Sequence, residues 1–316
     1  MAMRRFRIAQ DSMRPNLSPG DEVVAVDSRR PAPGDVVAFA HPRRTDFWLI
    51  KRVADPPEPV AIDHVWVLSD NADATRSDSR TLGALPIDIM WTVVDRLDSA
   101  SFAQACELLA GEDEALSQVL ERHGLPDFWA RDPGFATLVW LILEQQVSLE
   151  SGAAMYERLY ELAGAVTPEN VSDVGIGEMR EIGITRQKAT YLSGLAAAVL
   201  DGSLDIEALD SLPLPEAREV LLDIKGIGPW TADAYLLSAL RHPDVFPVGD
   251  RALQVGTAEA LGMADTPDPE ELEIVSESWK PIRAAAARII WHGYLADRGR
   301  VEPTDPTLTH RVGGDA

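Results

Sequence analysis

The spacing of the apolar positions changes near residue 98. Before that point the chain consists of short alternating segments separated by Pro, Gly and Asp, such as D-E-V-V-A-V (21–26), D-V-V-A-F-A (35–40) and F-W-L-I-K-R-V (47–53). These segments predict β-strands. Beyond it, longer runs such as F-A-T-L-V-W-L-I-L-E (135–144) have a helical period. We predict a mostly-β domain over residues 1–97 and an all-helical domain over 98–300, each large enough for its own core.

One segment of the helical domain has the pattern of a tight hairpin between two helices. An apolar run ends at Ile224, a second run starts at Trp230, and Gly226-Ile227-Gly228-Pro229 lies between them. Glycines allow positive backbone angles, and Pro suits the first position of a helix. The N–H groups at the start of the second helix can hold a phosphate without side-chain charge. The alternative is an ordinary turn between two helices.

Further motifs occur in order around this hairpin: L-I-L-E-Q-Q-V-S (141–148), G-I-T-R-Q-K-A-T-Y-L (183–192), F-P-V-G-D-R-A-L-Q (246–254) and W-K-P-I-R-A-A-A-A-R-I-I-W (279–291). Together they resemble the helix-hairpin-helix (HhH-GPD) DNA glycosylases over residues 98–296, and in particular the 3-methyladenine DNA glycosylases of type II. The resemblance implies excision of alkylated purines from double-stranded DNA in base-excision repair. It also implies that Asp250 is the catalytic aspartate.

The chemistry asked of Asp250 is cleavage of a glycosidic bond through a transition state with oxocarbenium character. A carboxylate near the sugar stabilises the developing positive charge and can orient or deprotonate the attacking water. An alkylated purine is already cationic, so it leaves without a strong general acid. Taken alone, Asp250 after Gly249 also fits a helix N-cap, and the two roles are compatible.

Two absences define the expected subtype. Relatives that also cut the DNA strand carry a Lys four residues after the first hairpin Gly, where this chain has Trp230, and Lys225 lies before the hairpin. We therefore predict a monofunctional glycosylase without a lyase step. Other relatives hold an iron–sulfur cluster on four Cys, but this chain has only Cys106. We predict no cofactor and no metal at the six His, and leave open a monovalent cation on hairpin carbonyls between Leu222 and Ile227.

A base that reacts must leave the duplex, so the resemblance also implies a pocket and a plug. Trp230 and Trp291 match positions that line the base pocket in the resembled enzymes, and indoles stack well on a cationic base. Tyr235 is a weaker candidate beside the family's aromatic position; core packing is the alternative for all three. Relatives insert a side chain into the DNA stack from the loop that here holds Gln145 and Gln146. Further DNA contacts are expected from Lys225, Gly226, Ile227, Gly228, Thr231 and Arg251.

The charge of the chain argues against a broad basic DNA-binding surface. The net charge is −22, and residues 100–316 hold 16 Lys and Arg against 36 Asp and Glu. Hairpin amides and a few local bases would have to serve one short stretch of duplex. The candidate bases are Arg186, Lys188, Arg251, Lys280 and Arg283.

The β domain contains a second group of motifs. D-S-M-R-P-N-L-S-P-G-D (11–21), Lys51 in I-K-R-V, and S-D-N-A-D-A-T-R-S-D-S-R-T-L-G (69–83) resemble the Ser/Lys peptidases of the signal-peptidase and repressor-cleavage type. The resemblance implies Ser12 as nucleophile and Lys51 as its base, with a peptide substrate. That role requires a lysine whose pKa is lowered by burial. Active proteolysis and a retained but idle fold both remain open.

Several features concern location and the chain end. The basic start M-A-M-R-R-F-R is not followed by an apolar stretch, and the longest apolar runs are too short to cross a bilayer. We expect a cytoplasmic protein that contacts no membrane. Residues 301–316 lack an apolar period and predict a disordered tail. The rival to the glycosylase is a peptidase whose helical domain directs it to DNA.

Overall fold

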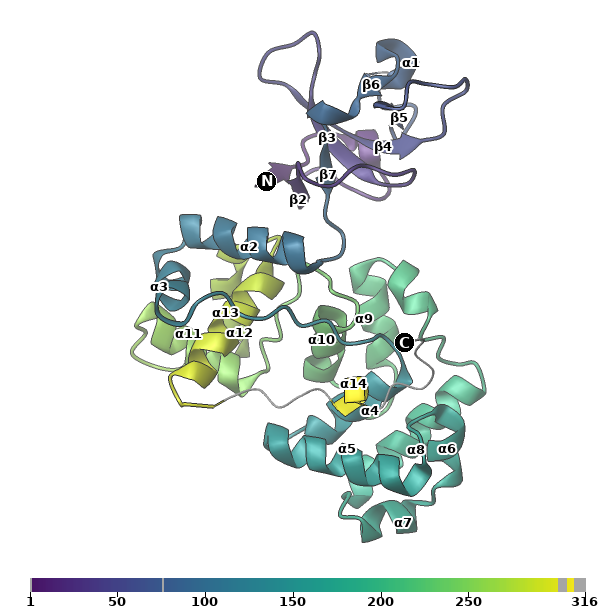
Figure 1. Cartoon of the computed structure of the whole chain (residues 1–316), viewed down its shortest axis with the longest axis vertical. Helices are drawn as coiled ribbons and strands as arrows, with labels where there is room; N and C mark the ends of the chain where they lie inside the picture. Colours follow the sequence, from purple (N-terminus) through teal and green to yellow (C-terminus); the bar gives the residue numbers. More distant parts are fainter. Residues whose placement is uncertain (1, 76, 301–305, 310–316) are drawn as a thin grey trace. The chain divides into compact units, whose positions relative to one another are not determined.

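The computed structural model describes residues 2–75, 77–300 and 306–309. The chain divides into two compact units, which Figure 1 shows with their elements labelled. The sheet unit comprises Met1–Asp113 with Trp279–Ile282, and the helical unit comprises Glu114–Ser278 with Arg283–Ala316. The predicted division into an antiparallel sheet followed by an all-helical region is confirmed.

The sheet unit contains one antiparallel sheet of order β1-β2-β7-β3-β4-β5-β6. Side chains alternate between the two faces of each strand, and on β4 this places Leu49, Lys51 and Val53 on the buried face. The elements are β1 (Met3–Arg7), η1 (Asp11–Met13), β2 (Glu22–Val26), β3 (Val36–Ala40), β4 (Trp48–Ala54), β5 (His64–Leu68), α1 (Ser79–Leu82), β6 (Leu85–Pro86), η2 (Ile87–Ile89), β7 (Trp91–Val93) and α2 (Ser99–Glu112).

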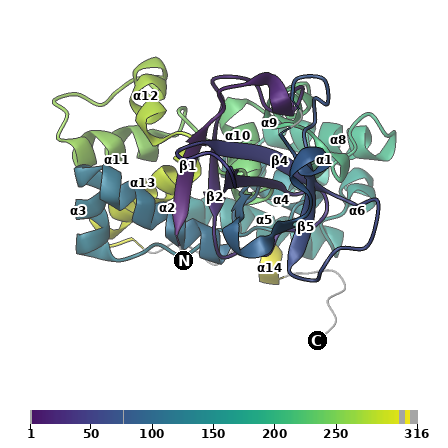
Figure 2. The ribbon, with the colours of Figure 1, turned by 90° about the horizontal axis from the view of Figure 1, so that it is seen from above.

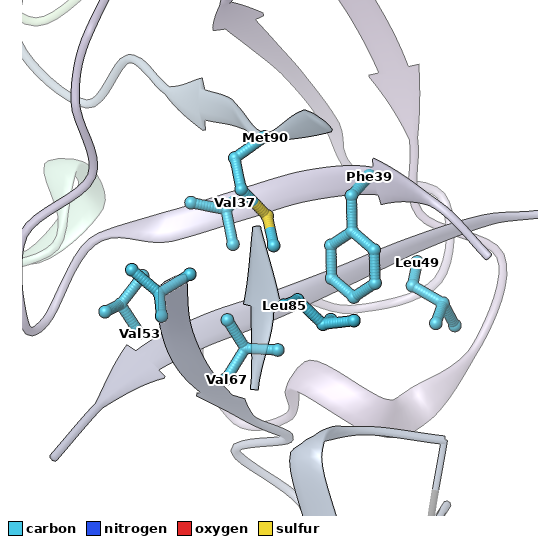
Figure 3. Close-up of a cluster of buried hydrophobic side chains, with 8 residues drawn as sticks. Val37, Phe39, Leu49, Val53, Val67, Leu85 and Met90 are labelled. Atoms are coloured by element: carbon cyan, nitrogen blue, oxygen red, sulfur yellow. The ribbon is translucent and has the colours of Figure 1, made fainter. Parts of the chain in front are cut away.

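The core of the sheet unit lies on one face of the sheet. Apolar side chains from four strands (β3, β4, β5 and β6) and from Met90 point toward one another there (Figure 3). Lys51 belongs to the same face and is 1% exposed, although it is charged in its ordinary state. The cluster consists of Val37, Phe39, Leu49, Val53, Val65, Val67, Leu85 and Met90.

The boundary between the units differs from the predicted one at residues 97 and 98. A helix does begin there, with Asp98 and Ser101 forming a capping box, but this helix, α2, packs with the sheet. The Gln104 side chain donates a hydrogen bond to Ser28, and Arg5 pairs with Glu112 at 2.8 Å. The boundary therefore falls after Asp113, because the apolar period of a helix does not specify which neighbour it packs against.

The helical unit has no strand among its described residues. Its elements are α3 (Glu114–His123), α4 (Phe135–Glu144), α5 (Leu149–Ala163), α6 (Pro168–Asp173), α7 (Ile176–Glu181), α8 (Arg186–Leu200), η3 (Ala208–Ser211), α9 (Leu214–Leu222), α10 (Pro229–Ser238), α11 (Arg251–Leu261), α12 (Pro269–Ser276), α13 (Arg283–Ala296) and α14 (Pro306–Thr309); η4 (Glu277–Trp279) leads into the segment Trp279–Ile282. Part of the predicted disordered tail is helical, because α14 lies within it. Pro306 and Thr307 of this helix are buried. The rest of that segment lies outside the described residues.

Two groups of helices form this unit. Helix α4 is buried along almost its whole length and packs against α5, α8 and α10. In the second group α11 and α3 both pack on α13 (Figures 1 and 2). Gly256 permits the close approach of α11, because a Cβ there would lie 2.8 Å from the Ile290 Cγ2 atom. Within residues 2–75, 77–300 and 306–309, no helix combines the length and the apolar character needed to cross a membrane.

Candidate active site

The hairpin expected from sequence lies between α9 and α10. Gly226 has a φ of +103°, and a Cβ at this position would lie 2.3 Å from the Tyr191 Cγ atom. Both the backbone angle and the contact therefore require glycine. Gly228 precedes Pro229, which is the first residue of α10. Ile227 is buried and anchors the turn, while the Lys225 side chain is exposed.

Gln145 fastens the loop after α4 to this hairpin. Its side-chain amide donates to the Gly226 carbonyl at 2.8 Å and to the Thr231 hydroxyl at 2.9 Å. This corrects the expectation that Gln145 contacts DNA as a plug, because its amide is engaged within the protein. Thr231 is 1% exposed and is likewise a structural residue. Gln146, by contrast, is exposed and has a φ of +57°, so it forms the tip of the loop.

The hairpin carbonyls are partly engaged already. Gly226 O accepts from Gln145, and Ile224 O accepts from the Ile227 N–H at 3.0 Å. The side chains of the described residues form no cluster of His, Cys, Asp and Glu that could hold a metal ion. No step of the chemistry described below depends on a cation at the hairpin.

Asp250 lies at the start of α11, where it caps the helix. Its Oδ1 atom accepts from the Leu253 N–H at 2.9 Å and from the Trp291 indole N–H at 3.0 Å. Its Oδ2 atom accepts from the Trp230 indole N–H at 2.7 Å. Three uncharged donors on α10, α11 and α13 therefore hold the carboxylate in one orientation.

The Asp250 carboxylate has no positively charged partner among the described residues. No Lys or Arg in the described part of the chain forms an ion pair with this carboxylate, and the neighbouring Arg251 turns to Gln254, 3.2 Å away. The charge of Asp250 is thus oriented by dipoles and is not neutralised by a cation. Such a carboxylate can stabilise positive charge that develops beside it.

The two tryptophans that contact Asp250 differ in their exposure. Trp230 is half-buried, while Trp291 is 7% exposed and packs against Trp129 with ring centroids 5.0 Å apart. The Arg288 guanidinium carbon lies 4.1 Å from the Trp129 ring centroid. Sequence analysis missed Trp129; the only signal was the aromatic pair in P-D-F-W (126–129), in a segment without helical period.

Tyr235 does not belong to this site. Its side chain has no exposed surface, and its hydroxyl oxygen accepts a hydrogen bond from the Gly134 N–H at 2.9 Å. Burial raises the pKa of Tyr235 above its ordinary range. The expectation that Tyr235 lines a base pocket is therefore corrected to a core role, which sequence register alone could not distinguish.

Two of the basic residues expected near DNA are also occupied within the protein. Lys188 is 8% exposed and donates to the Leu143 carbonyl at 2.6 Å. Arg283 pairs with Asp244 at 2.7 Å and with Glu273 at 2.8 Å. Arg186, Lys225 and Arg251 remain exposed on the helical unit.

The sheet unit contains a separate pair of polar side chains. Lys51 Nζ lies 3.0 Å from Ser12 Oγ and also donates to the Ile50 carbonyl at 2.8 Å. Burial lowers the pKa of Lys51 to about 8, although the Asp78 and Asp70 carboxylates oppose this shift. An amine with this pKa is neutral in about a tenth of molecules at pH 7 and in about half at pH 8, and the neutral form can accept a proton from a hydroxyl.

Backbone and carboxylate contacts hold this pair in place. The Asn71 N–H donates to the Ser12 carbonyl at 3.0 Å. Asp78 is completely buried, caps α1, and accepts from Ser69 and from the Arg80 guanidinium. Burial acts to raise the pKa of Asp78, but these hydrogen bonds outweigh it and lower the pKa. Residues after β5 thus lie around the Ser12–Lys51 pair and are fixed by hydrogen bonds.

Comparisons with known proteins match both units. Residues 139–281 match the model of the HhH-GPD superfamily of base excision DNA repair proteins. Residues 1–63, which include Ser12 and Lys51, match the model of signal peptidase, peptidase S26.

Similar proteins were found that match part of this chain. A DNA-3-methyladenine glycosylase of Bacillus subtilis is 28% identical over 53% of this chain, and one of Saccharomyces cerevisiae is 26% identical over 63% of it. The match spans 57% of the Bacillus protein and 73% of the yeast protein.

Solved structures are similar too. The 3-methyladenine DNA glycosylase of Schizosaccharomyces pombe, in complex with abasic DNA, is 27% identical, with a TM-score of 0.56 over 60% of this chain and 95% of that one. An 8-oxoguanine glycosylase/lyase of Clostridium acetobutylicum has a TM-score of 0.56 over 86% of this chain and 88% of that one, but its 17% identity supports the fold alone.

The lowered pKa of Lys51 predicts a pH-dependent stability of the sheet unit. Between pH 8 and 10.5 the unfolded chain binds more protons than the folded one, so the free energy of unfolding rises with pH across this window. Below pH 8 the folded unit carries the full cost of a buried charge, roughly 3 kcal/mol. We expect Lys51→Met to remove this dependence of stability on pH. Urea unfolding at pH 7.5 and pH 10, followed by limited proteolysis, measures the free energy of unfolding of both proteins.

Lys225→Met is the control, because this substitution removes an exposed lysine. Equal pH slopes in the wild type and in Lys51→Met would contradict the lowered pKa.

Proposed function

We propose that this chain, whose residues 139–281 form a domain of the HhH-GPD superfamily, is a monofunctional DNA glycosylase that excises alkylated purines in base-excision repair. The observation that carries the proposal is the Asp250 carboxylate, which two indole N–H groups and a helix N-terminus orient without a cationic partner. The names of its relatives support the substrate class.

The reaction we propose begins when the hairpin holds the DNA backbone and the damaged nucleotide leaves the stack. The bond between C1′ and the purine nitrogen breaks, and its electron pair neutralises the cationic base, which leaves. Asp250 stabilises the positive charge that develops on the sugar. Water then adds to C1′ and loses a proton, which yields an abasic site and free base.

The tryptophans contribute in two ways. Their indole N–H groups fix the two carboxylate oxygens of Asp250. The half-buried ring of Trp230 also offers a face on which a cationic purine can stack. Trp230 occupies the position at which strand-cutting relatives carry a lysine, so the chain lacks the amine for a Schiff base there.

Asp250→Asn tests the carboxylate directly. We expect release of methylated purine from duplex DNA to fall by at least about 100-fold, because a neutral amide of the same shape no longer stabilises the sugar cation. Single-turnover base release at saturating enzyme measures the change. Wild-type product should remain an uncut abasic strand until base or heat is applied.

Retention of base release by Asp250→Asn would contradict the catalytic assignment. Strand cleavage by the purified wild type would contradict the monofunctional assignment alone.

Trp291→Phe tests the orientation of Asp250 by the indole N–H. The substitution keeps an aromatic ring against Trp129 but removes the donor to Oδ1. We expect the single-turnover rate to fall about tenfold, since a hydrogen bond to a charged group contributes about 1.5–3 kcal/mol, while the Kd for DNA stays unchanged. A wild-type rate would show that packing of the ring is sufficient.

A second candidate function belongs to the sheet unit. We propose that Ser12 and Lys51 form the nucleophile and base of a serine peptidase, on the strength of the 3.0 Å contact and the pKa of about 8 for Lys51. Lys51 would take the Ser12 proton as Oγ attacks a peptide carbonyl, and would return it to the leaving amine. Similarity of residues 1–63 to signal peptidase supports this activity.

A hydroxyl-directed fluorophosphonate probe tests this activity in the full chain. We expect labelling of the wild type above pH 8, where Lys51 is mostly neutral. Ser12→Ala and Lys51→Met should both lose the label, whereas Ser79→Ala, which removes another buried hydroxyl of this unit, should retain it. No labelling of folded wild type across pH 7–10 would favour an idle fold.

A further inference from the structure

A hollow of about 450 Å³ lies at the surface of the helical unit beside the hairpin. Its walls come from the first turns of α8 and from the residue just before Gly226. The close packing of Gly226 on Tyr191 places the hollow next to the turn of the hairpin. The lining residues are Arg186, Gln187, Thr190, Tyr191 and Lys225.

Two cations, Arg186 and Lys225, line this hollow. Neither Arg186 nor Lys225 pairs with a carboxylate among the described residues, and no Asp or Glu lines the hollow. Residues 100–316 contain more than twice as many acids as bases. Arg131, Arg218, Arg283 and Arg298 of this unit each pair with one of those acids. Two adjacent unpaired cations therefore indicate an external anion.

The other side chains of the hollow complement a tetrahedral anion. The Gln187 amide donates to the Tyr191 oxygen at 2.7 Å, which leaves the phenol O–H available as a donor. Thr190 donates to the Arg186 carbonyl at 2.9 Å and so holds the first turn. Helix α8 is 15 residues long, and its positive end lies at this side of the hollow.

We infer that this hollow binds a backbone phosphate of the DNA strand, next to the phosphate that the hairpin amides hold. The inference rests on the proposed glycosylase function and extends it to a specific contact. Arg186 and Lys225 supply charge to one phosphate, and Tyr191 supplies a hydrogen bond. The contact gives an otherwise acidic unit a local attraction for DNA, independent of base sequence.

The test is the salt dependence of equilibrium binding between the full chain and a duplex with a stable tetrahydrofuran abasic site. Log K falls as log salt rises, and the loss of one phosphate contact makes this slope less steep by about 0.9. We expect this loss in the double variant Arg186→Ala/Lys225→Ala, with affinity about tenfold lower near 0.1 M salt.

Two controls separate this contact from general charge. Arg186→Lys/Lys225→Arg keeps both charges and should keep the wild-type slope. Arg122→Ala removes a cation from α3, which lies on the opposite side of the helical unit from α8 (Figures 1 and 2), and should also leave the slope unchanged. Thermal unfolding checks that each variant folds.

An unchanged slope in the Ala double variant, with wild-type DNA binding intact, would overturn the inference and leave the glycosylase proposal standing. Loss of base release at saturating enzyme would also overturn it, because the residues would then act in the reaction itself. Wild type that neither binds the duplex nor releases base would instead refute the proposed function, and this inference with it.

Discussion

The arrangement around Asp250 depends on hydrogen bonds from donors that carry no formal charge. Trp230 on α10, Trp291 on α13 and the backbone at the start of α11 each contribute one N–H. A lysine or arginine in their place would orient the carboxylate equally well but would cancel the charge that the reaction requires. The three helices must therefore meet within hydrogen-bonding distance of one side chain, which close packing at Gly256 helps to achieve.

The same preference for uncharged donors would allow this acidic chain to act on DNA as we propose. Backbone N–H groups of the hairpin can hold a phosphate without adding side-chain charge. The loop after α4 stabilises that hairpin through Gln145, so its conformation does not depend on DNA being present. Local cations would then need only to supplement this contact, and Arg186 and Lys225 form no ion pair among the described residues.

In the sheet unit burial adjusts the pKa of Lys51, whereas in the helical unit hydrogen-bond dipoles orient the Asp250 carboxylate. Lys51 lies on the apolar face of β4, where desolvation lowers its pKa to about 8 and a contact with Ser12 is maintained. The two proposed sites are chemically independent, because one depends on a carboxylate that retains its charge and the other on an amine that loses it. Substitutions at Ser12 and Asp250 can therefore be interpreted separately.

The sequence by itself determined the features that local physics controls. The change from alternating to helical periodicity predicted a sheet followed by helices, the Gly226–Pro229 turn predicted the hairpin, and Asp250 fitted an N-cap. Motif resemblance paired Ser12 with Lys51, and the structure brings these side chains together. Each of these predictions depends on a few neighbouring residues or on the order of short motifs.

Only the tertiary structure decided which polar and aromatic side chains are available. Tyr235 and Lys188 are buried, Gln145 is bonded to the hairpin, and Arg283 is paired, although their sequence positions suggested contact with DNA or base. The apolar periodicity likewise did not predict that α2 packs with the sheet. The physical reason is that burial and pairing depend on contacts between distant segments, which residue type and local spacing do not specify.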